Sequence, residues 1–345
     1  MKITLVGAYP PPWGGIQTHL VQLRHYLEQK GHECFIINLG KNKELTETNL
    51  RSPRTALEVA KILIKQNCDV IHLHFGGKIH LRLKLLTLFC CLLLRRPAVV
   101  TIHSGGLPHF SRFKRWGLMR IAFLKVKHII CVNPEIAKVF IDFGIPAERC
   151  QIIPAFAFKF ENPNSPLTGE TKEFLSKHNP VLTTVGLLEP EYDLSLLIRT
   201  MQDILNVHPK TGLYIIGSGS LYDRLKNEIK YFGLEDSIFL TGDYPHEQTI
   251  EILRRSNCYI RATLYDGDCL SIREAQALGI PVVASNTGMR PMPGTLFEIG
   301  NQQDFLEKIL GVLADKPDCS IQTFEFNDNL EEVVKILEAV KSLQS

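Results

Sequence analysis

The stretch YDGDCLSIREAQALGIPVVAS, residues 265–285, carries acidic side chains that could hold a metal ion or a sugar. Asp266 and Asp268 form a D-x-D pair, a pattern that can bind a divalent cation against a diphosphate. A helix is expected to begin directly after this pair, and its first amides supply positive potential without a metal. Those amides belong to three consecutive residues, Cys269, Leu270 and Ser271. We therefore expect an anion site beside Gly267 and no metal site.

The carboxylate of Glu274 lies about one turn inside that helix. It can accept hydrogen bonds from two vicinal hydroxyls such as those of a ribose. Asp266, in the loop, can accept hydrogen bonds from the hydroxyls of another sugar. The structural alternative is that Glu274 merely favours the helix dipole and that Asp268 is an N-cap. For Asp268 we expect the capping role.

Other strand ends also carry residues suited to binding. His103 closes an apolar strand and precedes two glycines, so it is a candidate site residue. Gly14 and Gly15 open a helix after the first strand, where bare backbone amides either approach a phosphate or form a plain turn. His72 and His74 share one strand, and two histidines alone do not make a metal site.

Alternating strand and helix patterns predict an α/β fold of two Rossmann-like domains with parallel sheets. A polar segment, residues 158–174, interrupts the pattern and is the expected linker. We expect an N-terminal domain over 1–160 and a C-terminal domain over 175–327, with a final helix over about 328–345 packing back on the first. The predicted strands are 2–8, 33–39, 69–74, 98–103 and 128–133, then 180–186, 212–217, 237–242, 258–263 and 281–285.

The overall composition is that of an ordinary soluble chain. The formal charge of +3 divides into +14 for residues 1–160, with 23 Lys and Arg against 9 Asp and Glu, and −11 for the remainder. A basic half suggests an anionic partner. The nine cysteines are scattered without a C-x-x-C pair, which favours a reducing, cytoplasmic location. The longest apolar run, 85–94, is too short to span a bilayer.

Taken together, these motifs resemble glycosyltransferase family 4, whose fold is GT-B and whose members are retaining and metal-independent. The resemblance covers nearly the whole chain and rests most on the D-x7-E element with ALGIPVVAS. Parts of it are similar to a bacterial subgroup for surface and extracellular polysaccharide synthesis. It implies a hexosyltransferase using a nucleotide diphosphate sugar, with UDP-glucose as the leading donor, and a glycan or lipid-linked glycan acceptor.

The resemblance also implies roles for single residues. Glu274 would hold the donor ribose, Asp266 the sugar hydroxyls, and the amides of Leu270 and Ser271 the diphosphate. His103 would lie beside the transferred sugar. The remaining donor-binding positions follow the first strand of the chain and the strands of the second half: Gly14, Gly15, Gly186, Gly217, Thr241, Gly242 and Asp243.

One departure from the family concerns the diphosphate. After Gly186 the family usually has an arginine and then a lysine that grip the phosphates, but this chain has Leu187 and Tyr192. Arg261 either binds the diphosphate in place of those two residues or forms a salt bridge with a neighbouring acid. Arg273 and Arg290 are weaker substitutes.

Three other classes of protein remain as alternatives. A non-catalytic nucleotide-sugar-binding protein is suggested by Leu187 and Tyr192, and a GT-B sugar-nucleotide epimerase would share the fold. A Rossmann dehydrogenase is disfavoured because no G-x-G-x-x-G fingerprint is present.

Residues 109–128 combine six basic residues with aromatic and aliphatic ones and contain no acid. This pattern predicts a helix lying on an anionic membrane surface, which would make the protein peripheral to the membrane. The alternative is an ordinary packed helix with a solvated basic face. Nucleic acid is not expected as a partner, because no recognisable binding module accompanies the charge.

Overall fold

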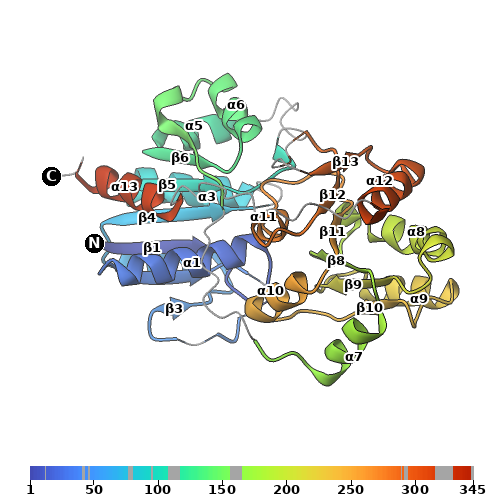
Figure 1. The fold of residues 1–345 in the computed structure, drawn as a ribbon. Coiled ribbons are helices and arrows are strands. Elements are labelled where there is room, and N and C mark those ends of the chain that lie inside the picture. Colours follow the sequence, from blue (N-terminus) through green and yellow to red (C-terminus); the bar gives the residue numbers. More distant parts are fainter. Residues whose placement is uncertain are drawn as a thin grey trace. The chain divides into compact units, whose positions relative to one another are not determined.

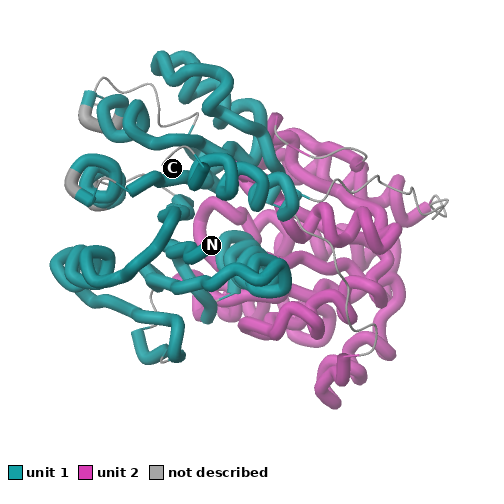
Figure 2. The backbone as a smooth tube through the Cα atoms, turned by 90° about the vertical axis from the view of Figure 1, so that its left-hand side faces the viewer, with its two compact units in different colours: residues 1–157, 326–345 teal, residues 158–325 magenta. Residues whose placement is uncertain are grey.

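The computed structural model describes two compact units (Figure 2). The first comprises residues 1–157 and 326–345, and the second comprises residues 158–325. Each is a parallel sheet covered by helices on both faces, which confirms the predicted pair of Rossmann-like domains. The described residues are all except 12, 41, 42, 46, 77–80, 95, 108–116, 156–164, 289, 291–293, 315–328 and 343–345.

The first unit is built on a seven-stranded sheet (Figure 1). The strand order is β3-β2-β1-β4-β5-β6-β7, so the order reverses between β1 and β4. The strands are rich in apolar and β-branched residues because both sheet faces are buried. They are β1 Lys2–Gly7, β2 Glu33–Asn38, β3 Leu50–Arg51, β4 Val70–Phe75, β5 Ala98–Ile102, β6 His128–Cys131 and β7 Cys150–Ile152.

Two hydrophobic cores lie on opposite faces of this sheet. α1 and the C-terminal helix α13 cover one face, where Leu330, Val333 and Leu337 recur at helical spacing against strand residues such as Ile3 and Val70. α2, α5 and α6 pack on the other face. The helices are α1 Gly15–Gln29, α2 Ala56–Lys65, α3 Leu81–Leu88, the π-helix η1 Phe89–Leu93, α5 Gly117–Lys125, α6 Pro134–Asp142, the 3-10 turn η2 Ala147–Arg149 and α13 Asn329–Ser342.

The second unit has a six-stranded sheet in the order β10-β9-β8-β11-β12-β13. Its order reverses between β8 and β11, which places the expected ligand-binding point of the sheet beyond the carboxyl ends of these two strands. The strands are β8 Val181–Val185, β9 Gly212–Ile216, β10 Ile238–Leu240, β11 Cys258–Arg261, β12 Val282–Ser285 and β13 Thr295–Phe297.

Helices of the second unit also divide between two faces. α8, α9 and α12 share one core, and α10 and α11 pack on the other face. Figure 1 labels these helices beside the strands of the second sheet. They are α7 Gly169–Lys177, the 3-10 turn η3 Pro190–Tyr192, α8 Leu194–Val207, α9 Tyr222–Tyr231, α10 His246–Arg254, α11 Leu270–Ala277 and α12 Gln302–Ala314.

The second unit begins earlier in the chain than residue 175, where we expected it. α7 already belongs to this unit, because the ring of Phe174 stacks on Phe239 with centroids 5.4 Å apart and contacts Tyr214 edge-on. The Thr168 hydroxyl accepts a hydrogen bond from the Thr171 amide at 3.2 Å and so caps α7. The polar composition that resembled a linker therefore includes a helix N-cap.

Within the described residues, no helix is both long enough and apolar enough to cross a bilayer.

Candidate functional site

The carboxyl ends of β8 and β11 are tied together by side chains. Arg261, the last residue of β11, donates from Nη1 to the carbonyl oxygen of Val185 at 2.7 Å. The Tyr259 hydroxyl donates to the same carbonyl at 3.3 Å. The loops that follow these two strands therefore begin at one sheet edge, where ligands bind in open parallel sheets.

Asp266 lies between two buried arginines at this edge. Its Oδ2 accepts from Arg261 Nη2 at 2.9 Å and Nε at 3.1 Å, and from Arg290 Nη1 at 2.8 Å. Arg290 is fixed in turn by the carbonyl of Ser285 at 2.9 Å and the hydroxyl of Thr263 at 2.6 Å. Arg261 thus forms the salt bridge with a neighbouring acid that was one of its two predicted roles. Arg290, a weaker candidate by sequence, pairs with the same carboxylate.

The cluster of Arg261, Asp266 and Arg290 carries a net positive charge. Burial alone would raise the pKa of Asp266, but the charges and hydrogen bonds of the two arginines outweigh burial and lower it to about 2. Asp266 is therefore ionised at neutral pH, and two guanidinium groups share one carboxylate. The uncompensated positive charge makes this edge suitable for an anion.

Tyr192 occupies the space beside Arg261, in place of a second cation. The Arg261 guanidinium carbon lies 4.8 Å from the centroid of the Tyr192 ring, a cation–π contact. A Cβ atom added at Gly186 would lie 2.3 Å from the same ring, so only glycine fits there. The sequence departure at Tyr192 therefore helps to position the arginine.

Asp268 does not have the capping role that we expected. The N-cap residue of α11 is Cys269, whose side chain makes no capping hydrogen bond, and Asp268 instead pairs with Arg273 Nε at 2.5 Å. A hydrogen bond between the carboxylate and a charged arginine is stronger than one between the carboxylate and a neutral backbone amide. Both carboxylates of the D-x-D pair are thus engaged by arginines, whereas a metal site would require them as ligands.

The first turn of α11 is anchored to the sheet through its side chains. The Ser271 hydroxyl lies 2.6 Å from the Tyr259 hydroxyl, and Cys269 is buried. The first amides of a helix have no partner within it, so the backbone at Leu270 and Ser271 forms the positive end of α11. This end follows directly from the loop that carries Asp266 and Gly267.

Glu274, one turn further along α11, is buried with 4% of its surface exposed. Its Oε1 lies 2.6 Å from His246 Nε2 at the start of α10. Burial by itself would lower the pKa of His246, but the hydrogen bond and charge of Glu274 outweigh it and raise the pKa. The imidazole thus fixes one carboxylate oxygen and orients the other.

The loops after β9 and β10 pair with one another. Gly217, which has φ +142°, donates its amide to the carbonyl of Gly242 at 2.8 Å, and the Ser218 hydroxyl donates to Asp243 at 2.8 Å. A Cβ atom at Gly217 would lie 1.8 Å from the carbonyl oxygen of Gly186, so this turn requires glycine. The Thr241 hydroxyl is hydrogen-bonded to the backbone of the same loop. The structure therefore brings together four predicted donor-binding residues, Gly217, Thr241, Gly242 and Asp243.

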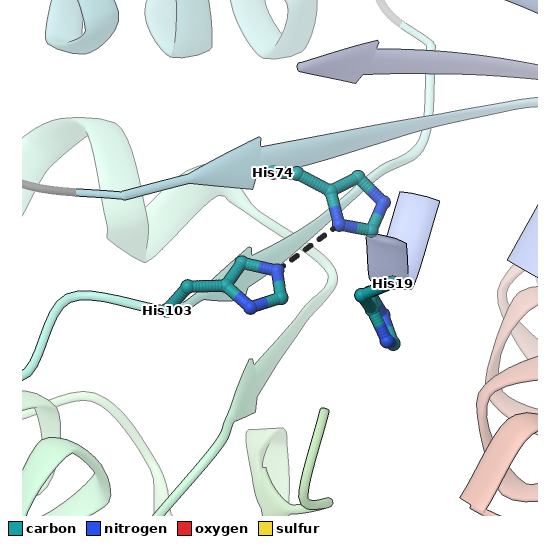
Figure 3. A group of neighbouring side chains, drawn as sticks. All are labelled: His19, His74 and His103. Carbon is teal, nitrogen blue, oxygen red and sulfur yellow. Dashed lines mark hydrogen bonds between the residues drawn. The ribbon is translucent and has the colours of Figure 1, made fainter. Parts of the chain in front are cut away.

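The first unit holds Gly14, Gly15 and His103 at the carboxyl edge of its own sheet. Gly14 is the N-cap of α1 and, as a glycine, has no side chain that could cap the helix. His103 follows β5, and its ring contacts that of His74 at the end of β4 (Figure 3). His72 is hydrogen-bonded to the Thr101 hydroxyl at 2.7 Å, as expected for a packed strand histidine.

The predicted membrane-binding stretch, residues 109–128, falls partly outside the described residues, because 109–116 are not described. Residues 117–125 of the stretch form α5, which buries Phe123 against Phe140, as a packed Rossmann helix does. Its other face exposes basic and aliphatic side chains at helical spacing. These are Arg120, Ile121, Leu124 and Lys125.

Sequence reasoning missed several partners of the site residues. His246 appears in the sequence only as the first residue of a helix, and its separation of 28 residues from Glu274 hides their contact. His19 was not considered because it lies among the apolar positions of α1. The one feature of the sequence that could have indicated His19 is that it is a histidine among the buried positions of a helix, and that this helix follows the glycine pair Gly14 and Gly15.

Comparison with known sequences identifies both units. Residues 13–156 match the family described as Glycosyltransferase Family 4, and residues 170–323 match Glycosyl transferases group 1. The fold and these matches define a glycosyltransferase of the GT-B class. Its N-terminal unit carries the family 4 sequence pattern, and its C-terminal unit carries the group 1 pattern.

Several curated relatives align with most of the chain. The alpha-monoglucosyldiacylglycerol synthase of Streptococcus pneumoniae is 23% identical over 94% of this chain and 80% of its own length. The UDP-Gal:alpha-D-GlcNAc-diphosphoundecaprenol alpha-1,3-galactosyltransferase of Escherichia coli is 24% identical over 85% and 78%. The phosphatidylinositol N-acetylglucosaminyltransferase gpi3 subunit of Schizosaccharomyces pombe is 22% identical over 94% and 75%.

Solved structures confirm the fold at lower sequence identity. Anabaena HepE in complex with UDP and glucose has a TM-score of 0.71 at 16% identity, covering 99% of this chain and 98% of that one. WaaG, a glycosyltransferase involved in lipopolysaccharide biosynthesis, also has a TM-score of 0.71, at 11% identity, with coverage of 98% and 99%.

Proposed function

We propose that the protein transfers a hexose from a nucleotide diphosphate sugar, UDP-glucose in the first place, to a glycan or lipid-linked glycan in polysaccharide biosynthesis. The transfer would retain the anomeric configuration and need no metal ion. The observation that carries the proposal is the buried Glu274 one turn inside α11, directly after the loop that holds Asp266 between two arginines. The comparisons support the donor class, since one similar structure contains UDP and glucose and one relative is named for UDP-Gal.

Each part of the donor would meet a group of matching chemistry. Oε2 of Glu274 would accept a hydrogen bond from the ribose, while His246 holds Oε1. The start of α11 and the net positive cluster of Arg261, Asp266 and Arg290 would stabilise charge as the diphosphate leaves. The leaving phosphate would itself accept the acceptor's proton, so no enzymic base is required.

Retention is supported by the names of two relatives. Both are named for alpha-linked products, and UDP-glucose and UDP-galactose are themselves alpha-linked. In the second unit Asp266 is committed to two arginines, so it is a poor nucleophile for a covalent glycosyl intermediate.

Two other activities fit the same fold. A putative UDP-N-acetylglucosamine 2-epimerase from Listeria monocytogenes is similar in structure, with a TM-score of 0.66 at 14% identity. An epimerase would change the sugar of the free nucleotide donor, and a binding protein would leave it intact. Analysis of the products by NMR with an added acceptor separates both from a transferase.

We expect Glu274→Ala to weaken the binding of UDP about 100-fold. Charge-assisted hydrogen bonds contribute about 1.5–3 kcal/mol each, and a 100-fold change in Kd corresponds to about 2.7 kcal/mol. The Kd is measured by isothermal titration calorimetry in buffer containing EDTA, because the proposed site uses no metal ion.

Glu251→Gln is the matched control for this loss. Glu251 is similarly buried, with 6% of its surface exposed, but lies on α10 and pairs with Arg255 at 2.7 Å. It should bind UDP as the wild type does, and thermal unfolding should show that both variants fold. Unchanged affinity for UDP in Glu274→Ala would remove Glu274 from the donor site.

A lipid-linked acceptor is supported by the relatives' names, which specify diacylglycerol, diphosphoundecaprenol and phosphatidylinositol. The exposed face of α5 offers aliphatic residues, Ile121 and Leu124, beside the basic Arg120 and Lys125. We expect this face to bind anionic lipid. At about 1 kcal/mol per cation, Arg120→Gln with Lys125→Gln should weaken binding to phosphatidylglycerol vesicles about 30-fold at low salt, measured by co-sedimentation.

The control removes two charges from another helix of the same unit. Lys61 and Lys65 are exposed on α2, which also exposes Leu57 and Ile64. Lys61→Gln with Lys65→Gln should leave vesicle binding unchanged. If both pairs of substitutions reduce binding equally, the attraction is a general property of the basic unit and α5 is ordinary scaffold.

A further inference from the structure

Three histidines from separate elements of the first unit form a compact group (Figure 3). His19 comes from α1, His74 from β4, and His103 follows β5. Their ring centroids are 5.1 to 5.6 Å apart, and one nitrogen of each ring lies within 4.8 Å of one nitrogen of each other ring. No other group of three His, Cys, Asp or Glu side chains with this spacing occurs among the residues that the structure describes.

The hydrogen bonds of these rings leave nitrogen atoms without partners. His19 Nδ1 is 2.8 Å from the carbonyl oxygen of Ala155, so it is the donating nitrogen of that ring. Within the described part of the chain, Nε2 of His19 is buried and has no hydrogen-bond partner. Nε2 of His74 is also buried without a partner there, but the His74 nitrogen that lies near His103 is Nδ1. A buried ring nitrogen that receives no hydrogen bond is unfavourable unless its lone pair binds another group, such as a metal ion.

We propose that His19, His74 and His103 bind one divalent transition-metal ion such as Zn²⁺, with the fourth ligand position open to water. Zinc–nitrogen bonds of about 2.0–2.1 Å at tetrahedral angles place ligand nitrogens about 3.3–3.4 Å apart. Nδ1 of His74 and Nε2 of His103 are already 3.3 Å apart. The widest separation among the three ligating nitrogens, at most 4.8 Å, must shorten by up to about 1.5 Å when the ion binds.

Burial disfavours protonation of the three rings. Burial lowers the pKa of His19 to about 4 and holds those of His74 and His103 well below the usual value. The rings are therefore neutral at physiological pH, and neutral imidazole is the form that ligates metals. The three rings bring no negative charge, so hydroxide or another anion is the expected fourth ligand.

The surroundings resemble a supported ligand shell. The bond from His19 Nδ1 to the Ala155 carbonyl engages one ring nitrogen and leaves Nε2 as the nitrogen that can ligate an ion, as outer hydrogen bonds do in metal sites. His74 is held on a central strand of the sheet, while His103 is half-buried and gives an ion a route from solvent. Glu274 and the Asp266 cluster of the proposed donor site belong to the second unit and not to this group. His103 is the one ligand that the family resemblance also assigns to the donor sugar.

The test is uptake of Zn²⁺ by the full-length protein. After treatment with EDTA and removal of the chelator, the wild type should bind one Zn²⁺ per chain, measured by equilibrium dialysis and elemental analysis. His19→Gln should raise the Kd about 100-fold or more, because loss of an outer-shell partner alone costs 10–100-fold. His103→Asn, at the half-buried position, should do the same and serves if His19→Gln does not fold.

His25→Gln is the matched control, since His25 is exposed on the same helix as His19. It should bind Zn²⁺ as tightly as the wild type, and thermal unfolding without metal verifies that each variant is folded. Equal affinity in His19→Gln and the wild type would place the ion elsewhere and overturn the proposal. So would the absence of stoichiometric uptake by the wild type.

Discussion

Arg261→Ala is expected to lower kcat/KM for sugar transfer about 100- to 1000-fold. Arg261 is buried at the end of β11 and, with Arg290, gives the Asp266 cluster its excess positive charge. Removing one fixed donor that stabilises charge in a transition state has effects of this size. The family positions that normally carry phosphate-gripping cations are Leu187 and Tyr192 here, so no second cation at those positions can take over.

Steady-state kinetics of purified variants measure this loss, with folded protein quantified by thermal unfolding. Leu187→Ala should change kcat/KM by only a few-fold, since its side chain offers no charge to the diphosphate. Arg255→Ala is the second control, because it removes an arginine that pairs with Glu251 away from α11. Equal, small losses in Arg261→Ala and Leu187→Ala would mean that another group stabilises the leaving diphosphate.

The strands of both sheets were predictable because buried parallel strands are short, continuous apolar segments between helical patterns. β4 and β11 differ from their predicted bounds by no more than two residues. The strands that the sequence did not predict are β3, β7 and β13, each of two or three residues at a sheet edge. An edge strand of that length buries too little side-chain surface to show a periodic pattern.

The sequence predicted the location of those site residues that directly follow a strand or begin a helix. Glu274 and Asp266 lie where the sequence put them, at the carboxyl edge of the second sheet. Their partners were not predictable, because contacts of Asp266 with Arg290, 24 residues away, depend on how the chain returns after β12. The same reason explains the error over Asp268, since local capping rules do not include a competing arginine.

Asp266→Ala is expected to lower the free energy of unfolding of the protein by about 3–5 kcal/mol. The substitution leaves two guanidinium groups facing one another in a site where the side chains of Arg261 and Arg290 are 6% and 2% exposed. Uncompensated charges in such a place are strongly unfavourable, which is why breaking a buried ion pair has a large effect. Urea denaturation, followed by a probe of the second unit, measures the change.

Asp268→Ala is the matched comparison, two residues along the same loop. It removes a carboxylate paired with one arginine, Arg273, which is 28% exposed and can be solvated, so its effect should be clearly smaller. The sign of the pH dependence gives a second check. The pKa of Asp266 is lowered from 3.8 to about 2, so its stabilisation is complete above the higher value and is lost as the pH falls through the lower one. The difference in stability between the wild type and Asp266→Asn should therefore shrink over that interval. A loss of less than about 1 kcal/mol in Asp266→Ala at neutral pH, within the range of an ordinary surface pair, would show that the two arginines find other partners.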